Sequence, residues 1–228
     1  MSKNAIKIQS VIVIMVMAMV MLFTGCDSMD PAMKVTVDGN EFQLGCTVKE
    51  ILDSGFELAD IDHKNGIIHD YPDMEGRSLT TSSIYLFKDG KPSHVAIYIC
   101  NKGTSTVKLE ECTVYGFKYD CGSYASDSKE TGYLDVKFNG IDARFADRKT
   151  VVGDLESQGF KFKDNEKADF FRENDAYSKS LVSATGMFGH DLTVYNDYDY
   201  NTGNRYVNGI EFKEKLQYDT SGAWSEPK

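Results

Sequence analysis

Apolar and polar residues alternate in two short stretches that end in the same kind of turn. Residues 35–39 and 136–140 each hold an alternating strand followed by Asp-Gly or Asn-Gly, with an offset of 101 residues at the glycine. These dipeptides accept the positive φ angles of the tight turns that join hairpin strands. The pattern therefore predicts two β-hairpins, with second strands over residues 41–44 and 142–145.

Each predicted hairpin is followed by apolar residues at helical spacing. Residues 47–56 are matched at an offset of 104 by residues 151–160. Thr47 and Glu50 have the spacing of a capping box, and each segment ends in glycine followed by phenylalanine, the pattern of a left-handed stop with its hydrophobic contact. In the second copy Thr150 stands one residue early, which predicts a weaker cap. Each segment is predicted to form a short helix.

Extended apolar segments end each copy and predict an antiparallel three-stranded meander. Turn residues 88–91 close the first meander hairpin, and residues 185–189 close its counterpart. His94 and His190, 96 residues apart, both open the middle strand, so the duplication accounts for them without a ligand. The six segments are residues 84–87, 95–100, 107–117, 181–184, 192–195 and 206–212.

The whole pattern predicts an α+β fold of two tandem repeats, each a β-hairpin, a short helix and an antiparallel three-stranded meander. Residues 120–132 are rich in Gly, Ser, Asp and Lys and separate the two copies. Such a composition is typical of a linker between compact units. The copies are expected in tandem or sharing one face.

The first 26 residues follow a different pattern. Lys3 and Lys7 precede an unbroken apolar run over residues 11–23, and these 13 residues suit an export signal. A membrane-spanning helix needs roughly 20 residues. The run ends in Leu22-Phe23-Thr24-Gly25-Cys26. This ending resembles the lipobox of bacterial lipoproteins, with Phe23 where Leu is usual. An ordinary secretory signal or an uncleaved anchor is the alternative interpretation.

The resemblance implies a type II signal peptide that is removed before Cys26, whose thiol receives a diacylglycerol. Together with a fatty acid such as palmitate, this gives stable membrane anchoring, whereas one chain gives marginal binding. The expected location is the cell membrane, lipid-anchored and facing the extracytoplasmic side. The expected organisation is signal peptide 1–25, lipidated tether 26–32, repeat domain 33–119, linker 120–132, repeat domain 133–216 and polar C-terminal tail 217–228.

Charge limits the partners of the exported body. The chain has a formal net charge of -10, and loss of Lys3 and Lys7 makes the mature body more acidic. Nucleic-acid binding depends on clustered Lys and Arg, and no basic run occurs in the mature sequence. Nucleic acid is therefore excluded as a partner. Anionic lipid is also repelled, so membrane attachment is expected through the lipid on Cys26.

Four cysteines remain beside Cys26, namely Cys46, Cys100, Cys112 and Cys121. Outside the cytoplasm an even number favours disulfides, but four buried thiols are an equal alternative, and four cysteines allow three connectivities. At an offset of 96, Cys100 and Cys112 align with Asn196 and Asn208, so both members of this pair change together. Cys100 and Cys112 are therefore the candidate disulfide.

Catalytic and cofactor motifs with recognisable spacing do not occur in the sequence, so no catalytic residue, cofactor or metal is expected. Residues 60–73 contain two histidines and four aspartates, a set that could hold a divalent metal. A solvated loop is the favoured interpretation. Residues 196–203 resemble a calcium loop but depart from the EF-hand positions of Gly and Glu. A long hairpin loop is favoured there.

Tyrosines gather near that second loop and form the candidate ligand surface, which consists of Tyr195, Tyr198, Tyr200 and Tyr206. Aromatic rings of this kind can stack on sugars or contact a partner protein, and covering a sheet face is the alternative role. The predicted function is a non-catalytic ligand- or protein-binding lipoprotein. An envelope structural or assembly factor is the second hypothesis, and a hydrolase whose groups converge from both repeats is the third.

In outline, the predicted architecture also resembles exported two-repeat proteins of the β-lactamase-inhibitor type. In that type, paired small domains present a concave sheet surface to a protein. The resemblance concerns the architecture alone and implies no function for this chain.

Overall fold

The computed structural model describes residues 32–60, 66–80, 83–122, 132–163, 177–185, 190–199, 202–214, 217–218 and 224–225. Residues 31–228 form one compact unit. The predicted signal peptide and lipidation site at Cys26 lie outside the described residues. Within the described parts, no helix is long and apolar enough to cross a bilayer.

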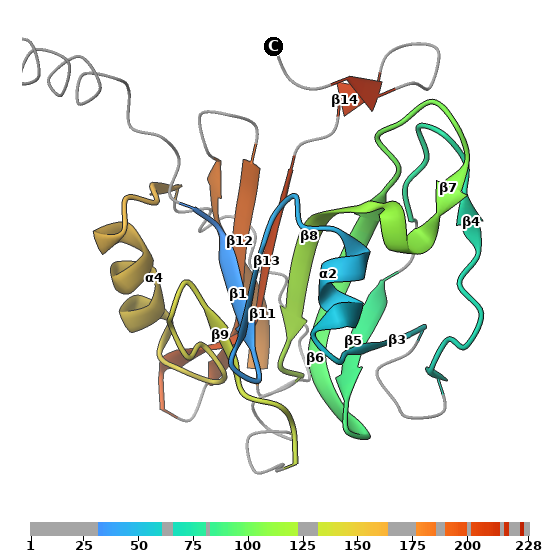
Figure 1. Ribbon diagram of the computed structural model, residues 1–228. Helices are drawn as coiled ribbons and strands as arrows, with labels where there is room; N and C mark the ends of the chain where they lie inside the picture. Colours follow the sequence, from blue (N-terminus) through green and yellow to red (C-terminus); the bar gives the residue numbers. More distant parts are fainter. Residues whose placement is uncertain are drawn as a thin grey trace, which may run out of the picture. The chain divides into compact units, whose positions relative to one another are not determined.

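One large antiparallel sheet dominates the fold (Figure 1). Its eight strands, in order across the sheet, are β10 (Phe162–Lys163), β11 (Tyr177–Thr185), β12 (His190–Asp199), β13 (Asn204–Glu214), β8 (Thr113–Asp120), β6 (Lys91–Cys100), β5 (Ile84–Lys88) and β3 (Glu57–Ala59). Each copy supplies four neighbouring strands, and β8 and β13 join the copies at the centre.

The remaining elements are short. They are β1 (Lys34–Val37), β2 (Asn40–Gln43) and β9 (Val136–Phe138) in a three-stranded sheet, the helices α2 (Val48–Asp53) and α4 (Arg148–Ser157), the 3₁₀ helix η2 (Leu109–Glu111), and the strand pairs β4 (Asp73–Met74) with β7 (Val107–Lys108) and β14 (Gln217–Tyr218) with β15 (Trp224–Ser225).

The core lies between the large sheet and the layer formed by the helices and the β1–β2–β9 sheet. Figure 1 shows α2 in front of β6 and β8. Phe138 of β9 packs against Phe212 of β13, with ring centroids 5.3 Å apart. Ile51 of α2 and Leu155 of α4 are buried in the same cluster. Apolar burial of this kind is the main stabilising contribution, about 25 cal/mol per Å².

The expected α+β class is wrong, because the described fold is mainly β. α2 has six residues and α4 has ten, whereas β6, β12 and β13 reach ten or eleven. The predicted meanders gain a fourth strand, since β3 and β10 pair with β5 and β11. The predicted strands were too short, because β12 and β13 continue through polar residues beyond the apolar runs that marked them.

A pseudo-twofold axis relates the two copies. In the β8–β13 pair, Lys118 lies opposite Glu211, and these are equivalent positions of the two copies. In the β1–β9 pair, Thr36 lies opposite Lys137, which is also its equivalent. Two antiparallel pairings thus place matching residues face to face, and a twofold axis perpendicular to the sheet leaves both copies with the same face toward the core.

The predicted hairpin turns form, but the second hairpin opens early. Asp38 and Asn139 both have a φ of 47°, as expected for the first residue of a primed turn. Residues 142–145 do not form the predicted strand. Instead Phe145 donates its backbone N–H to the carbonyl of Val207 in β13. The backbone N–H of Val207 in turn donates to the carbonyl of Ala146. Gly45 and Val114 repeat the first of these bonds in the other copy.

The second helix starts earlier than predicted. Asp147, not Thr150, is its N-cap, and the Asp147 carboxylate accepts the Thr150 backbone N–H at 3.1 Å. Thr47 caps α2 with Glu50 in the predicted capping box. The N-caps Thr47 and Asp147 are 100 residues apart, whereas Gly55 and Gly159, which follow the helices, are 104 residues apart. Helix α4 is therefore four residues longer than α2, about one helical turn.

Strand pairing also corrects the alignment of the copies. Tyr98 lies opposite Gly116 and Tyr195 lies opposite Gly209, and a bulge follows each tyrosine. Tyr98 and Tyr195 are therefore equivalent, at an offset of 97 and not 96. With these offsets Cys100 matches Asp197, and His94 and His190 are not equivalent positions.

Candidate functional site

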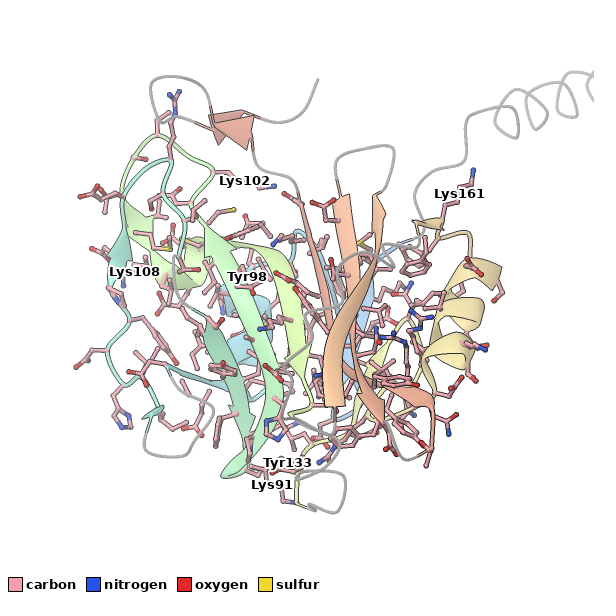
Figure 2. All side chains as sticks on the ribbon, turned by 180° about the vertical axis from the view of Figure 1, so that it is seen from behind. Lys91, Tyr98, Lys102, Lys108, Tyr133 and Lys161 are labelled. Carbon is pink, nitrogen blue, oxygen red and sulfur yellow. The ribbon has the colours of Figure 1, made fainter. Side chains whose placement is uncertain are left out.

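The face of the large sheet opposite the core carries the candidate site. Side chains alternate between the two faces of a strand. On β6 the residues Val95, Ile97 and Ile99 join the core, so Tyr98 points to the opposite face. Figure 2 shows the sheet from this side, with Tyr98 labelled on β6. Among the described elements, neither α-helix lies over this face. We call it the open face.

Two tyrosines related by the pseudo-twofold axis each cover a glycine of the neighbouring strand. A Cβ atom added to Gly116 would lie 2.7 Å from Cδ2 of Tyr98. A Cβ atom added to Gly209 would lie 3.5 Å from Cδ2 of Tyr195. The Tyr98 ring therefore occupies the space that a side chain at position 116 would fill. At position 209 the closest atom is the backbone oxygen of Tyr119, at 2.9 Å, and the Tyr195 ring lies at van der Waals distance. The two glycines let the rings lie across β8 and β13, toward the axis.

The hydroxyl groups of both tyrosines reach one carboxylate. Tyr195 donates its hydroxyl to Oε2 of Glu211 at 2.6 Å, and the Tyr98 hydroxyl lies close enough to this carboxylate to help lower its pKa. Lys213 donates its ammonium group to Oε1 at 3.0 Å. The Glu211 side chain is only 10% exposed, so its charge is stabilised by these donors and not by water. We call Tyr98, Tyr195, Glu211, Lys118, Asp120 and Lys213, with the two glycines, the axis cluster.

The protonation of the cluster follows from this arrangement. Burial alone would raise the pKa of Glu211, but hydrogen bonds from Tyr195 and Lys213 outweigh it and hold the pKa below its ordinary value. Burial, followed by the neighbouring Glu211, raises the pKa of Tyr98 and of Tyr195. At neutral pH the carboxylate is therefore ionised and both tyrosines keep their protons as donors.

The outer charges of the cluster are more exposed. The Lys213 side chain is 41% exposed and forms the 3.0 Å pair with Glu211. On β8, Lys118 lies 3.7 Å from Asp120, with side chains 34% and 56% exposed. The cluster thus presents one cation and one anion from each copy.

A third aromatic residue extends the cluster in the first copy only. Tyr115 is the extra residue of the β8 bulge, and its ring lies 5.8 Å from that of Tyr98. Its equivalent on β13 is Asn208, which is buried and donates to Asp197 at 2.9 Å. The aromatic surface is therefore larger on the side of the first copy.

The structure divides the predicted tyrosine surface. Tyr195 belongs to the axis cluster, whereas Tyr198, three positions on, points to the other face and lies under Arg205 at 5.0 Å. Tyr206 accepts from the Asn204 amide at 3.3 Å, away from the cluster. Tyr200 lies outside the described residues.

Sequence reasoning missed Tyr98, Glu211 and the two glycines of the cluster. Aligning the copies at an offset of 97 would have matched Tyr98 with Tyr195, but the two glycines, 18 and 14 positions later, match only at an offset of 93. No local pattern, however, indicates that β8 and β13 lie side by side.

The cysteines with described positions are free thiols. Burial raises the pKa of Cys46, Cys100 and Cys121 to about 12 and that of Cys112 to about 11. All four therefore keep their protons at neutral pH and are weak nucleophiles. Cys112 belongs to the core cluster, while Cys100 lies opposite Thr113. The Cys100–Cys112 disulfide stays a prediction.

The candidate metal loops are only partly described. His69 and Asp70 are exposed, and residues 61–65 lie outside the described part of the chain. In the second loop, the Asp199 carboxylate accepts the Thr202 hydroxyl at 2.8 Å. Among the residues with described positions, no group of three His, Cys, Asp or Glu side chains is arranged to hold a metal ion.

No family model matches this chain, and neither does any curated protein or solved structure that was compared with it. The functional interpretation therefore depends on the residues themselves.

Proposed function

We propose that this chain is a lipid-anchored, extracytoplasmic binding protein that contacts a partner protein through the open face and performs no catalysis. The observation that carries the proposal is the pair Tyr98 and Tyr195, held by one buried carboxylate at the axis between the copies. Envelope assembly would be one use of such a partner.

The anchor is supported by the lipobox at the N-terminus. Cys26 follows Thr-Gly at the end of a 13-residue apolar run. Two acyl chains at this cysteine would hold the body at the membrane without any contribution from its acidic surface. The chain then acts where its partner also reaches the outer side of the membrane.

Rigid tyrosines favour binding. Tyrosine combines a large apolar ring with a hydroxyl group and is enriched in the energetically important centres of protein interfaces. The rings of Tyr98 and Tyr195 are already fixed by a glycine below and a carboxylate at the hydroxyl. Little side-chain entropy is then lost when a partner binds.

The electrostatics of the cluster suit binding better than acid–base catalysis. A catalytic acid or base works best when its pKa lies near the working pH. Here the pKa of Glu211 is lowered and the pKa values of Tyr98 and Tyr195 are raised, so each group moves away from neutrality. At neutral pH both tyrosines stay protonated and Glu211 stays ionised, so none of the three exchanges a proton readily.

Ligand binding by the purified mature protein tests this proposal. Tyrosine rings labelled for NMR are observed while detergent-solubilised membrane proteins, secreted proteins and cell-wall glycans are added. A protein ligand that shifts Tyr98 and Tyr195, with affinity lost about tenfold or more in Tyr195→Ala, supports it. Binding of glycans alone, turnover of any substrate, or equal affinity in Tyr195→Ala contradicts it.

Lipidation has its own test. Labelled palmitate should enter the wild-type protein in cells and fail to enter Cys26→Ala. Equal incorporation into both proteins would exclude the anchor.

A further inference from the structure

The two copies repeat the shape of the axis cluster but reverse its charges. Shape is repeated because a tyrosine covers a glycine in each copy. Charge is reversed because β8 carries a cation and then an anion where β13 carries an anion and then a cation. The equivalent pairs are Tyr98 with Tyr195, Gly116 with Gly209, Lys118 with Glu211, and Asp120 with Lys213.

Reversal places opposite charges at the two ends of the cluster. Lys213 lies opposite Gly116, and its ammonium group is 6.0 Å from the Tyr98 ring centroid. At the middle level Lys118 lies opposite Glu211; Lys118 pairs with Asp120 at 3.7 Å and Glu211 with Lys213 at 3.0 Å. Lys213 is the cation at the outer end of the cluster.

The other end is negative. Asp120 lies opposite Gly209, the glycine covered by Tyr195. Because Tyr195 also lies opposite Gly209, on the other side of β13, Asp120 and Tyr195 are at the same level of the sheet, and Asp120 contributes to raising the pKa of Tyr195 after burial and the effects of Glu211 and Tyr98. Asp120 and Lys213 have the most exposed charges of the cluster, with side chains 56% and 41% exposed, against 34% for Lys118 and 10% for Glu211.

We propose that these end charges set the direction in which an extended segment of a partner protein lies across the tyrosine pair. The segment carries an acidic side chain at the Lys213 end and a basic side chain at the Asp120 end. A surface of equal shape at both ends would accept either direction, and the charges remove that ambiguity. This inference rests on the proposed function of the open face.

The spacing of the two ends defines the segment further. Asp120 lies four residues along β8 from Gly116, the residue opposite Lys213. Four residues of a strand span about 13 Å. In an extended peptide, residues i and i+4 are on the same side and equally far apart. The partner segment is therefore expected to carry its opposite charges four residues apart.

Synthetic peptides provide the probe. Four nine-residue peptides have matched apolar composition and differ in their charged residues. The first carries Asp and Lys four residues apart, the second carries Asp and Lys side by side, the third carries two Asp, and the fourth carries two Lys. A nitroxide at one end reports direction by broadening the NMR signals of the nearer tyrosine. The first peptide should bind the mature protein about fivefold more tightly than the others, with its acidic end broadening Tyr98 and not Tyr195.

Neutral variants separate this inference from the function on which it rests. Asp120→Asn with Lys213→Gln should keep binding of the first peptide but broaden both tyrosines equally. Lys49→Gln with Asp53→Asn removes a similarly exposed ion pair of α2 and should change nothing. If the first peptide kept its direction on Asp120→Asn with Lys213→Gln, or if all four peptides bound equally tightly, the end charges would not set the direction, while the open face could still be the binding site. Unchanged binding in Tyr195→Ala would instead show that the open face is not the binding site.

Discussion

Lys118 and Glu211 face each other across the central strand pair, and each is the other's counterpart in the duplicated chain. This relationship locates the pseudo-twofold axis in the middle of one sheet. The copies are therefore halves of a single continuous sheet. Tyr98 and Tyr195, which come from strands on either side, meet at Glu211 because of this axis.

Glycine substitutions should show how closely the tyrosines pack. A Cβ atom at position 116 would come within 2.8 Å of both Tyr98 and the Lys213 Cβ, so Gly116→Ala forces one strand or ring to move. We expect a loss of about 1–3 kcal/mol in the free energy of unfolding, measured by denaturant titration.

Gly153 in α4 is the matched control, because no atom lies within 4 Å of its added Cβ. Gly153→Ala should stabilise the protein by about 0.5–1 kcal/mol, since alanine is the better helix former. Equal effects at both glycines would mean that Tyr98 does not cover Gly116.

Glu211→Gln should change the ionisation of the tyrosines. The carboxylate raises the pKa of Tyr195 by its hydrogen bond and its charge, in addition to the larger effect of burial. Without the charge, Tyr195 and Tyr98 should ionise at lower pH in a spectrophotometric titration. Glu41→Gln, at an exposed ion pair on β2, should leave the titration as in the wild type.

The same carboxylate should make stability depend on acid pH. Its folded-state pKa lies below the ordinary 4.5, so the ionised form stabilises the folded protein above that value. This contribution is lost as the pH falls through the folded pKa. The free energy of unfolding of Glu211→Gln should therefore vary less than that of the wild type below about pH 5. Parallel pH curves would contradict the hydrogen bonding seen at Glu211.

Helix α4 should depend on Asp147 and much less on the Thr150 side chain. The Asp147 carboxylate accepts the backbone N–H of Thr150, which Thr150→Ala preserves. We expect Asp147→Ala to cost about 1 kcal/mol of stability and Thr150→Ala a smaller amount. Thermal unfolding of the two variants measures the difference, and a larger cost at Thr150 would place the cap there instead.

The sequence predicted the local features of this fold and missed the long-range ones. Turn dipeptides and the Thr47–Glu50 cap depend on neighbouring residues, and they form as expected. The start of α4 was missed because the extra helical turn precedes the matched pattern. The α+β class was wrong because the strands extend well beyond the apolar runs that marked them.

The candidate site was predicted only at Tyr195. The offset between the copies changes from 97 in β6 and β12 to 93 in β8 and β13, because the connections between these strands differ in length, so a constant offset cannot align the copies. The carboxylate that joins the tyrosines comes from a third strand, and only the pairing of β12, β13, β8 and β6 brings the residues together. Such non-local pairing leaves no periodic trace in a single sequence.

Site-specific photo-crosslinking in cells tests the central claim most directly. A photoreactive phenylalanine analogue replaces Tyr195 on the open face or the exposed Lys49 of α2, in the otherwise wild-type protein. We expect a discrete crosslinked protein from position 195 that is absent from position 49 and is lost when Tyr98 is also changed to Ala. The same product from both positions, or monomer alone from position 195, would contradict it.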